Sequence, residues 1–185
     1  MRCFLAIVPP KGVIQQITSF SQQFEFGQYF KHTNIKSFHI TFEFYSDLPI
    51  NLTKKVSNQL AFEISKIDQF KICPGEYATW PNRVQSKVLI LKIIKSRSIH
   101  LLKELISRVN ENYLINTESR RFKPHISIGR WSKPFHLEKS VLNKMNREKT
   151  NQCFTAPELV LFKSQLSQTG VSYIKLNSFS FNDES

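Results

Sequence analysis

Two short segments of the chain place a histidine two residues ahead of a hydroxyl, His39-Ile40-Thr41 and His125-Ile126-Ser127. Each lies in a run that alternates apolar and polar residues, which is the period of a β-strand. Residues two apart on a strand point to the same face, so each histidine shares a face with its hydroxyl. The pattern alone is weak, because a single histidine on a half-buried strand more often has a structural role. The other histidines, His32, His100 and His136, lack it, and we expect them in surface or packing positions.

Such a pair of motifs has the components for acid–base chemistry at phosphorus. Displacement at a phosphodiester requires one group that removes a proton from the attacking oxygen and another that delivers a proton to the departing oxygen. Imidazole titrates near pH 6.5, so one ring can be neutral and act as the base while the other is protonated and acts as the acid. The hydroxyls of Thr41 and Ser127 could donate hydrogen bonds to the non-bridging oxygens, or they could simply suit a strand. This scheme needs no metal ion.

The elements that must position these motifs occur twice, in the same order. The first copy is predicted to contain an apolar strand (residues 3–8), an amphipathic helix (13–20) and the first motif strand (38–45). The second copy repeats this with a strand (88–93), a helix (101–109) and the second motif strand (125–130). His39 follows Leu5 by 34 residues and His125 follows Leu89 by 36. Because both motifs occupy the same place in their copies, a catalytic pair is favoured over a chance match.

The remainder of each copy also corresponds. A helix near residues 54–67 precedes short strands near 70–73 and 77–80, and a helix near 137–147 precedes Phe154 and a strand at 159–162. Residues 173–176 and 179–181 are predicted to form a closing hairpin or edge strands. The sequence therefore predicts a single bilobal domain over residues 1–185, with repeats at about 1–83 and 84–185.

The charge of the chain favours a polyanionic partner without requiring one. With 26 Lys and Arg residues against 14 Asp and Glu, the formal net charge is +12. Such a charge attracts RNA, but it can equally serve as a solvated surface. Arg120, Arg121 and Lys123, just before the second motif, could steer a phosphate backbone or solvate a loop.

The three cysteines, Cys3, Cys73 and Cys153, are isolated in sequence, so neither a zinc site nor a disulfide framework is expected, and a reducing compartment fits best. The apolar run at residues 3–8 ends at two prolines and is too short for a signal-peptide core or a membrane span. We therefore expect a cytoplasmic protein that does not enter a membrane.

In these features the sequence resembles the 2H phosphoesterases, and within them the RNA 2',3'-cyclic phosphodiesterases, also called 2'-5' RNA ligase-like proteins. The resemblance covers nearly the whole chain and is carried by residues 1–7, 38–44, 121–130, 161–164 and 170–173. The position of Arg130 is usually basic in the family and helps to hold the substrate. Two features depart from the family pattern: Ser127 stands where threonine is common, and residues 45–47 replace a frequent Leu-Gly.

The resemblance implies an α+β fold of two pseudo-symmetric lobes, each an antiparallel sheet backed by helices, with a central active-site cleft. It implies a metal-independent enzyme without a cofactor that hydrolyses a 2',3'-cyclic phosphate on an RNA end to a 2'-phosphate, with reversible 2',5' RNA ligation in some members. His39 would be the acid and His125 the base that activates water. The expected partner is RNA or an oligonucleotide with a cyclic phosphate or 2',5' linkage, bound by a monomer.

Two alternatives remain open. The chain could be a 2H phosphodiesterase that cleaves 2',5'-oligoadenylate or another small cyclic phosphate, or a module that binds RNA ends without turnover. In each case Thr41, Ser127 and Arg130 are expected to contact phosphate. Phe4 could stack on a nucleobase, although core packing is the stronger expectation for one of 16 phenylalanines.

Overall fold

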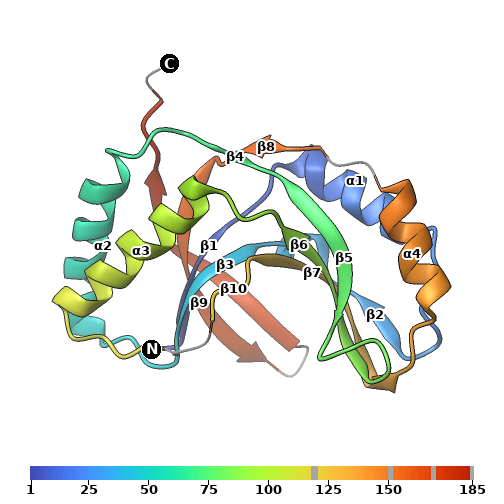
Figure 1. Ribbon diagram of the computed structural model, residues 1–185. Helices are drawn as coiled ribbons and strands as arrows, with labels where there is room; N and C mark the ends of the chain where they lie inside the picture. Colours follow the sequence, from blue (N-terminus) through green and yellow to red (C-terminus); the bar gives the residue numbers. More distant parts are fainter. Residues whose placement is uncertain (118–120, 150–151, 168–169, 184–185) are drawn as a thin grey trace.

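A central β-sheet with a pair of helices at each end dominates the computed structural model, which describes residues 1–117, 121–149, 152–167 and 170–183 (Figure 1). In chain order the elements are β1 (Cys3–Ile7), α1 (Lys11–Ser21), β2 (Phe30–His32), η1 (Ile35–Ser37), β3 (Ile40–Tyr45), α2 (Ile50–Ile64), β4 (Lys71–Ile72), β5 (Pro74–Trp80), β6 (Ser86–Ile93), α3 (Arg97–Asn112), β7 (His125–Phe135), α4 (Lys139–Glu148), β8 (Phe154–Thr155), β9 (Glu158–Ser167) and β10 (Gly170–Ser180). The other strands and helices predicted from periodicity are present with shifted ends, but residues 173–176 and 179–181, predicted as a closing hairpin or edge strands, belong to one continuous edge strand, β10.

One eight-stranded sheet runs through the molecule in the order β10-β9-β1-β3-β7-β6-β5, with β2 paired to β7. Its pairings are antiparallel. At the centre, β3 and β7 are joined by a single residue pair, Ile40 with Ile126. The two halves of the sheet therefore diverge on either side of this pair.

Helices cover each half of the sheet, as Figure 1 shows: α2 and α3 lie together at one end, and α1 and α4 at the other. This α+β architecture confirms the predicted fold class. Each half of the sheet contains strands from both halves of the sequence. Strand β5 of the first copy pairs with β6 of the second, and β9 of the second copy pairs with β1 of the first. The repeat boundaries at about residues 83 and 84 stay a prediction. Among the described helices, none has the length and apolar character needed to cross a membrane.

The strand β1 is the most deeply buried element near the centre of the sheet. Its residues are 0–4% exposed, as the continuous apolar run predicts for a strand covered on both faces. The helix α2 begins at Ile50, earlier than the predicted residue 54. The prediction missed this first turn because the exposed Ile50 does not follow the apolar period of the helix. The helix α3 likewise begins before the predicted residue 101, at Arg97. Ser96 caps this end, because its side chain accepts a hydrogen bond from the Ile99 amide at 3.3 Å.

Both motif strands contain a β-bulge at the same place. The extra residue is Phe42 in β3, directly after Thr41, and Ile128 in β7, directly after Ser127. A bulge inserts one residue into one strand and shifts the alternation of its side chains. The shift is visible in the burial of β3, where Phe42 and Glu43 are both buried and Phe44 turns back toward solvent.

The bulge overturns the simple alternation predicted for the first motif strand. That pattern placed Glu43 on the polar face, whereas the Glu43 side chain is 5% exposed and points to α3. Its carboxylate accepts hydrogen bonds from Lys103 Nζ at 2.8 Å and Asn110 Nδ2 at 3.2 Å. Asn110 in turn accepts from the Tyr45 hydroxyl at 2.9 Å. A buried carboxylate is tolerated because it is paired and hydrogen-bonded.

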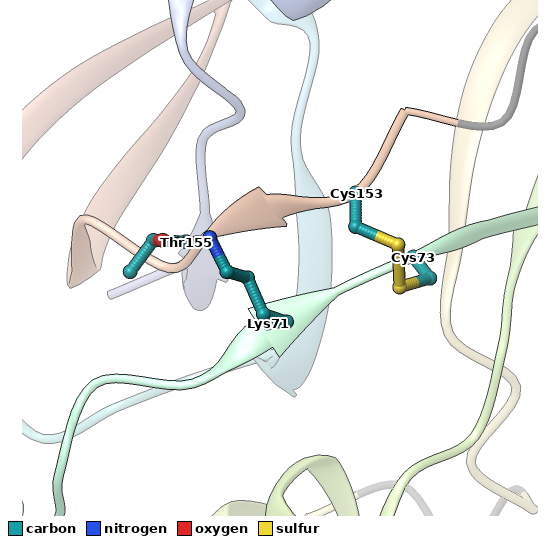
Figure 2. Close-up of a disulfide and its surroundings, with 4 residues drawn as sticks. All are labelled: Lys71, Cys73, Cys153 and Thr155. Carbon is teal, nitrogen blue, oxygen red and sulfur yellow. Dashed lines mark hydrogen bonds between the residues drawn. A yellow bond between two sulfur atoms is a disulfide. The ribbon is translucent and has the colours of Figure 1, made fainter.

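Cys73 and Cys153 form a disulfide, so the expectation that the cysteines form no disulfide is wrong. The short strands β4 and β8 pair with Lys71 opposite Thr155, and extending that register places the two cysteines opposite each other, with Cα atoms 4.2 Å apart. Lys71 Nζ also donates to Thr155 Oγ1 at 2.9 Å across the pair (Figure 2). The separation of 80 residues hid this pairing, although both cysteines flank equivalent strands of the two copies. A disulfide also disagrees with the expected reducing compartment.

Candidate active site

The pairing at the centre of the sheet brings the two motifs together. Ile40 of β3 lies opposite Ile126 of β7 in antiparallel register. Continued by one residue in each direction, this register sets His39 across from Ser127 and Thr41 across from His125. All four side chains flank the isoleucine pair and are half-buried. Because residues beside a paired position share the opposite face, the four functional groups form one patch at the midline of the sheet.

The two histidine rings are anchored in the same way. His39 Nδ1 donates to the Ser37 carbonyl oxygen at 2.7 Å, and His125 Nδ1 donates to the Lys123 carbonyl oxygen at 2.8 Å. A carbonyl oxygen can only accept, so the proton of each neutral ring resides on Nδ1. Each Nε2 is thereby left to accept a proton, or to donate one when the ring is charged. Both copies supply the same tautomer.

Aromatic side chains pack against both rings. The His39 ring lies 4.9 Å from the Phe4 ring and meets the edge of Tyr173 at 5.4 Å, measured between centroids. The His125 ring lies 4.3 Å from the Trp80 ring in an edge arrangement. The Nδ1 hydrogen bond and the neighbouring aromatic rings together hold each imidazole in its orientation.

Burial lowers the pKa of both rings below the ordinary value for histidine. For His39, burial is the largest cause, and the Nδ1 bond to Ser37 opposes it, while the charges of His125 and Arg130 lower the pKa further. For His125, burial again dominates, the bond to Lys123 opposes it and Arg130 adds to the lowering. Arg130 therefore acts electrostatically on both rings. An anionic phosphate between the rings would raise both pKa values, since a negative charge favours the protonated imidazole.

A groove of about 830 Å³ opens beside this patch and is lined by Thr41 of the first motif, His125 of the second and several basic side chains, whereas His39 and Ser127 do not line it. Its basic lining residues are Lys103, Arg121, Lys123 and Arg130. Glu43 is the one acidic residue among the described residues that line the groove, and its charge is already paired with that of Lys103. The groove is thus suited to a bound anion.

Arg130 reaches the groove because of the bulge in β7. It lies three residues after Ser127, and in a regular strand an odd separation would turn it to the opposite face. The extra residue Ile128 restores it to the face of Ser127, and the Arg130 side chain is exposed and lines the groove. Thr41 and His125 line the same groove.

Phe4 occupies a different place from that of a base-stacking residue. Its ring is 4% exposed and is enclosed by His39, Phe162 and Tyr173, at centroid distances of 4.9, 5.2 and 4.8 Å. The surroundings of Phe4 therefore favour the packing alternative, in which the Phe4 ring packs against His39.

The other residues considered in the sequence lie partly in the groove and partly away from it. Arg121 and Lys123 line the groove, and Arg120 lies outside the described residues. Each remaining histidine has a local partner: His32 packs edge-on to Phe30, His100 lies 3.2 Å from Glu104, and His136 contacts Arg83 at 2.9 Å. In the part of the chain that the structure describes, no group of three or more His, Cys, Asp or Glu side chains is placed to hold a metal ion.

Trp80, Tyr173 and Lys103 were not predicted as site residues. Trp80 and Tyr173 contact the two rings from strands far away in sequence, and Lys103 enters the groove from α3. The alternation of their own segments marks only strand or helix. In the sequence, the available signals for these positions were the Trp80-Pro81 pair and Tyr173 in the closing strand. Neither residue type indicates a catalytic role by itself.

The chain is similar to known proteins over most of its length. Residues 9–168 match the family model described as the 2'-5' RNA ligase superfamily. The RNA 2',3'-cyclic phosphodiesterase of Methanocaldococcus jannaschii is 26% identical over 175 residues, which cover 94% of this chain and 96% of that protein. Among solved structures, a Thermus thermophilus protein superposes with a TM-score of 0.80 at 20% identity over 100% of both chains. E. coli LigT complexed with 3'-AMP superposes with a TM-score of 0.78 at 15% identity over 97% of both.

Proposed function

The chain belongs to the 2'-5' RNA ligase superfamily of 2H phosphoesterases, and from this premise we propose that it hydrolyses the 2',3'-cyclic phosphate at an RNA end to a 2'-phosphate. The observation that carries the proposal is the antiparallel pairing of Ile40 with Ile126, which sets two His-x-Thr/Ser motifs side by side on one face. The name of the relative from M. jannaschii supports this substrate.

In the proposed reaction the two rings act on the two oxygens that exchange at phosphorus. Nε2 of neutral His125 removes a proton from water, and the water oxygen forms a bond to phosphorus. The bond from phosphorus to the 3'-oxygen breaks, and Nε2–H of protonated His39 delivers the proton to that oxygen. The 2'-phosphate product keeps the bond to the 2'-oxygen. When the 5'-hydroxyl of a second RNA takes the place of water, the same displacement forms the 2',5' linkage expected from the resemblance, and the roles of the two rings exchange when that linkage is cleaved in the reverse reaction.

Three further groups stabilise the charge that builds on the non-bridging oxygens. The hydroxyls of Thr41 and Ser127 donate hydrogen bonds from the positions beside the rings, and the Arg130 guanidinium supplies positive charge from the wall of the groove. Since the Nδ1 atoms are held by backbone carbonyls, the Nε2 atoms need no reorientation when the substrate binds.

The direct test is to incubate an RNA oligonucleotide that carries a 2',3'-cyclic phosphate end with the protein in EDTA and to identify the product. The expected product is the 2'-phosphate. His39→Ala and His125→Ala should each lower kcat/KM by about 10²–10⁴-fold, the usual contribution of acid–base groups. His100→Ala, a histidine on the exposed side of α3, is the matched control and should leave the rate unchanged.

Three outcomes would contradict the proposal. Unchanged turnover by either histidine variant would contradict the assigned roles. A 3'-phosphate product would show that the bond from phosphorus to the 2'-oxygen breaks instead of the bond to the 3'-oxygen. Tight binding of the RNA end with no product over long incubation would instead indicate a binding module.

A further inference from the structure

A second cavity of about 300 Å³ adjoins the groove on the side of His125. The two hollows share a wall made of Trp80, Arg121, Lys123 and His125. Because the two hollows share this wall, an RNA strand that extends from the phosphate site past His125 enters the second cavity directly. The reaction proposed above uses none of this space.

The sheet register explains why the cavity lies on the same face as the motifs. In the pairing of β6 with β7, Lys92 lies opposite His125 and Ile90 lies opposite Ser127. Residues directly opposite each other on paired strands share a face. Ile90 and Lys92 line the cavity, so it is the continuation of the active face by one strand toward the edge.

The cavity combines an apolar floor with a flat aromatic wall. Ile90 and Ile93 are 0% and 4% exposed, Pro124 is buried, and the half-buried Trp80 ring stands between the cavity and the groove. Because the floor residues are buried, Trp80 supplies the accessible apolar surface, and unpaired nucleobases bind to such rings by stacking, with little dependence on base identity.

Basic side chains surround this floor. Lys92, Lys95, Arg121 and Lys123 all line the cavity and are exposed. Lys92 Nζ lies 3.6 Å from the Glu76 carboxylate, which offsets part of its charge. Lys95, Arg121 and Lys123 therefore supply the field that an anionic phosphodiester would meet.

We propose that this cavity binds the nucleotide that precedes the one carrying the cyclic phosphate, with its base against Trp80 and its phosphodiester beside Lys95 and Lys123. The inference rests on the proposed function and deepens it: the protein selects the end of an oligonucleotide over a mononucleotide with the same cyclic phosphate. Because the cavity holds about one nucleotide, the preference is complete at the dinucleotide.

The test compares kcat/KM for a mononucleotide, a dinucleotide and a trinucleotide that all end in a 2',3'-cyclic phosphate. The dinucleotide should exceed the mononucleotide by about tenfold or more, in line with base–aromatic stacking, and the trinucleotide should add little. Lys95→Gln should reduce the ratio of dinucleotide to mononucleotide. Lys87→Gln, an exposed lysine of β6 outside both hollows, removes the same charge and should preserve the ratio. Equal kcat/KM for mononucleotide and dinucleotide, or equal effects of the two lysine variants, would overturn the inference.

A binding measurement separates this inference from the proposed function. The chain has two tryptophans, and Trp131 is 5% exposed and packed against Phe30 and Phe135, so a ligand in the cavity should quench Trp80. The probe is a deoxydinucleotide ending in a 3'-phosphate, which has no 2'-hydroxyl and is not turned over. Saturable quenching that is lost in Trp80→Phe and weakened in Lys95→Gln would support the site even if no cyclic phosphate were hydrolysed. Absence of quenching by the wild-type protein would refute the site even if hydrolysis were observed.

Discussion

At the scale of single residues, the two histidines are distinguished by their anchoring. Each Nδ1 donates to the carbonyl oxygen two residues upstream, at 2.7 and 2.8 Å. The backbone therefore selects the tautomer, and Nε2 is the atom that can exchange protons with a ligand. The spacing of the motifs predicts which residues meet. It contains no information on the carbonyls or on the burial that lowers the pKa of both rings, since these depend on the folded surroundings.

The lowered pKa values predict an acidic optimum for kcat/KM. Activity requires one protonated and one neutral ring, and a lowered pKa means that the acid loses its proton at a lower pH. The profile of the free enzyme should therefore be bell-shaped with its maximum below about pH 6.5, and should fall about tenfold per pH unit on the alkaline side. The measurement is kcat/KM for the dinucleotide cyclic phosphate over pH 4.5–9, a range of about two pH units on either side of the ordinary histidine pKa.

Arg130 supplies a comparison for this profile. Its charge lowers the pKa of both rings, so Arg130→Gln should move both limbs of the profile to higher pH as well as weaken binding. A rate that stays level up to pH 8, or limbs that do not move in the variant, would contradict the assignment of two buried imidazoles as acid and base.

At the scale of elements, the paired bulges in β3 and β7 explain how the site is completed. The bulges follow Thr41 and Ser127 directly and turn Glu43 inward and Arg130 outward. Sequence pattern predicted the motif strands and the helices, because burial on one face imposes a period, and the apolar strands, because burial on both faces gives a continuous apolar run. It could not predict the bulges, since an extra residue changes the pairing partner and leaves the local composition unaltered.

Gly129 in β7 provides a test of the close packing behind the second motif. A Cβ added there would lie 2.2 Å from the Phe30 ring and 2.8 Å from the Lys31 carbonyl oxygen of β2. Gly129→Ala should therefore lower the free energy of unfolding by about 1–3 kcal/mol, the usual cost of overpacking, as measured by urea denaturation. Gly12→Ala is the matched control, because a Cβ at this position in α1 meets nothing within 4 Å and should stabilise the helix slightly. Equal stability of the two variants would show that β2 does not approach β7 as described.

At the scale of the whole molecule, the two halves of the sheet diverge from one residue pair and are tied together again at β4 and β8. The duplication of order and spacing predicts that two similar halves face each other. It does not reveal that β5 and β9 exchange partners, or that Cys73 and Cys153 meet, because both depend on how the two copies pack in space. Local sequence patterns carry the least information about which distant strands pair in a sheet.

Reduction of the disulfide should destabilise the protein without changing the motifs. Closing a loop of 80 residues removes conformational entropy from the unfolded chain, so reductant should lower the free energy of unfolding by about 2–4 kcal/mol. The measurement is the Tm with and without reductant. A Cys73→Ser/Cys153→Ser double variant should have a Tm below that of the unreduced wild type, and reductant should not change it. A wild-type Tm that ignores reductant, together with three titratable thiols in the unreduced protein, would show that the bond does not form.

The central claim is that both imidazoles act on one phosphorus atom, and a crystal structure with inorganic phosphate bound tests it most directly. The quantity to measure is the distance from the phosphate oxygens to Nε2 of His39 and Nε2 of His125. The account predicts one phosphate within hydrogen-bond distance of both Nε2 atoms and of the Thr41 and Ser127 hydroxyls. A phosphate bound by one ring alone, or two phosphates held separately by the two rings, would contradict it.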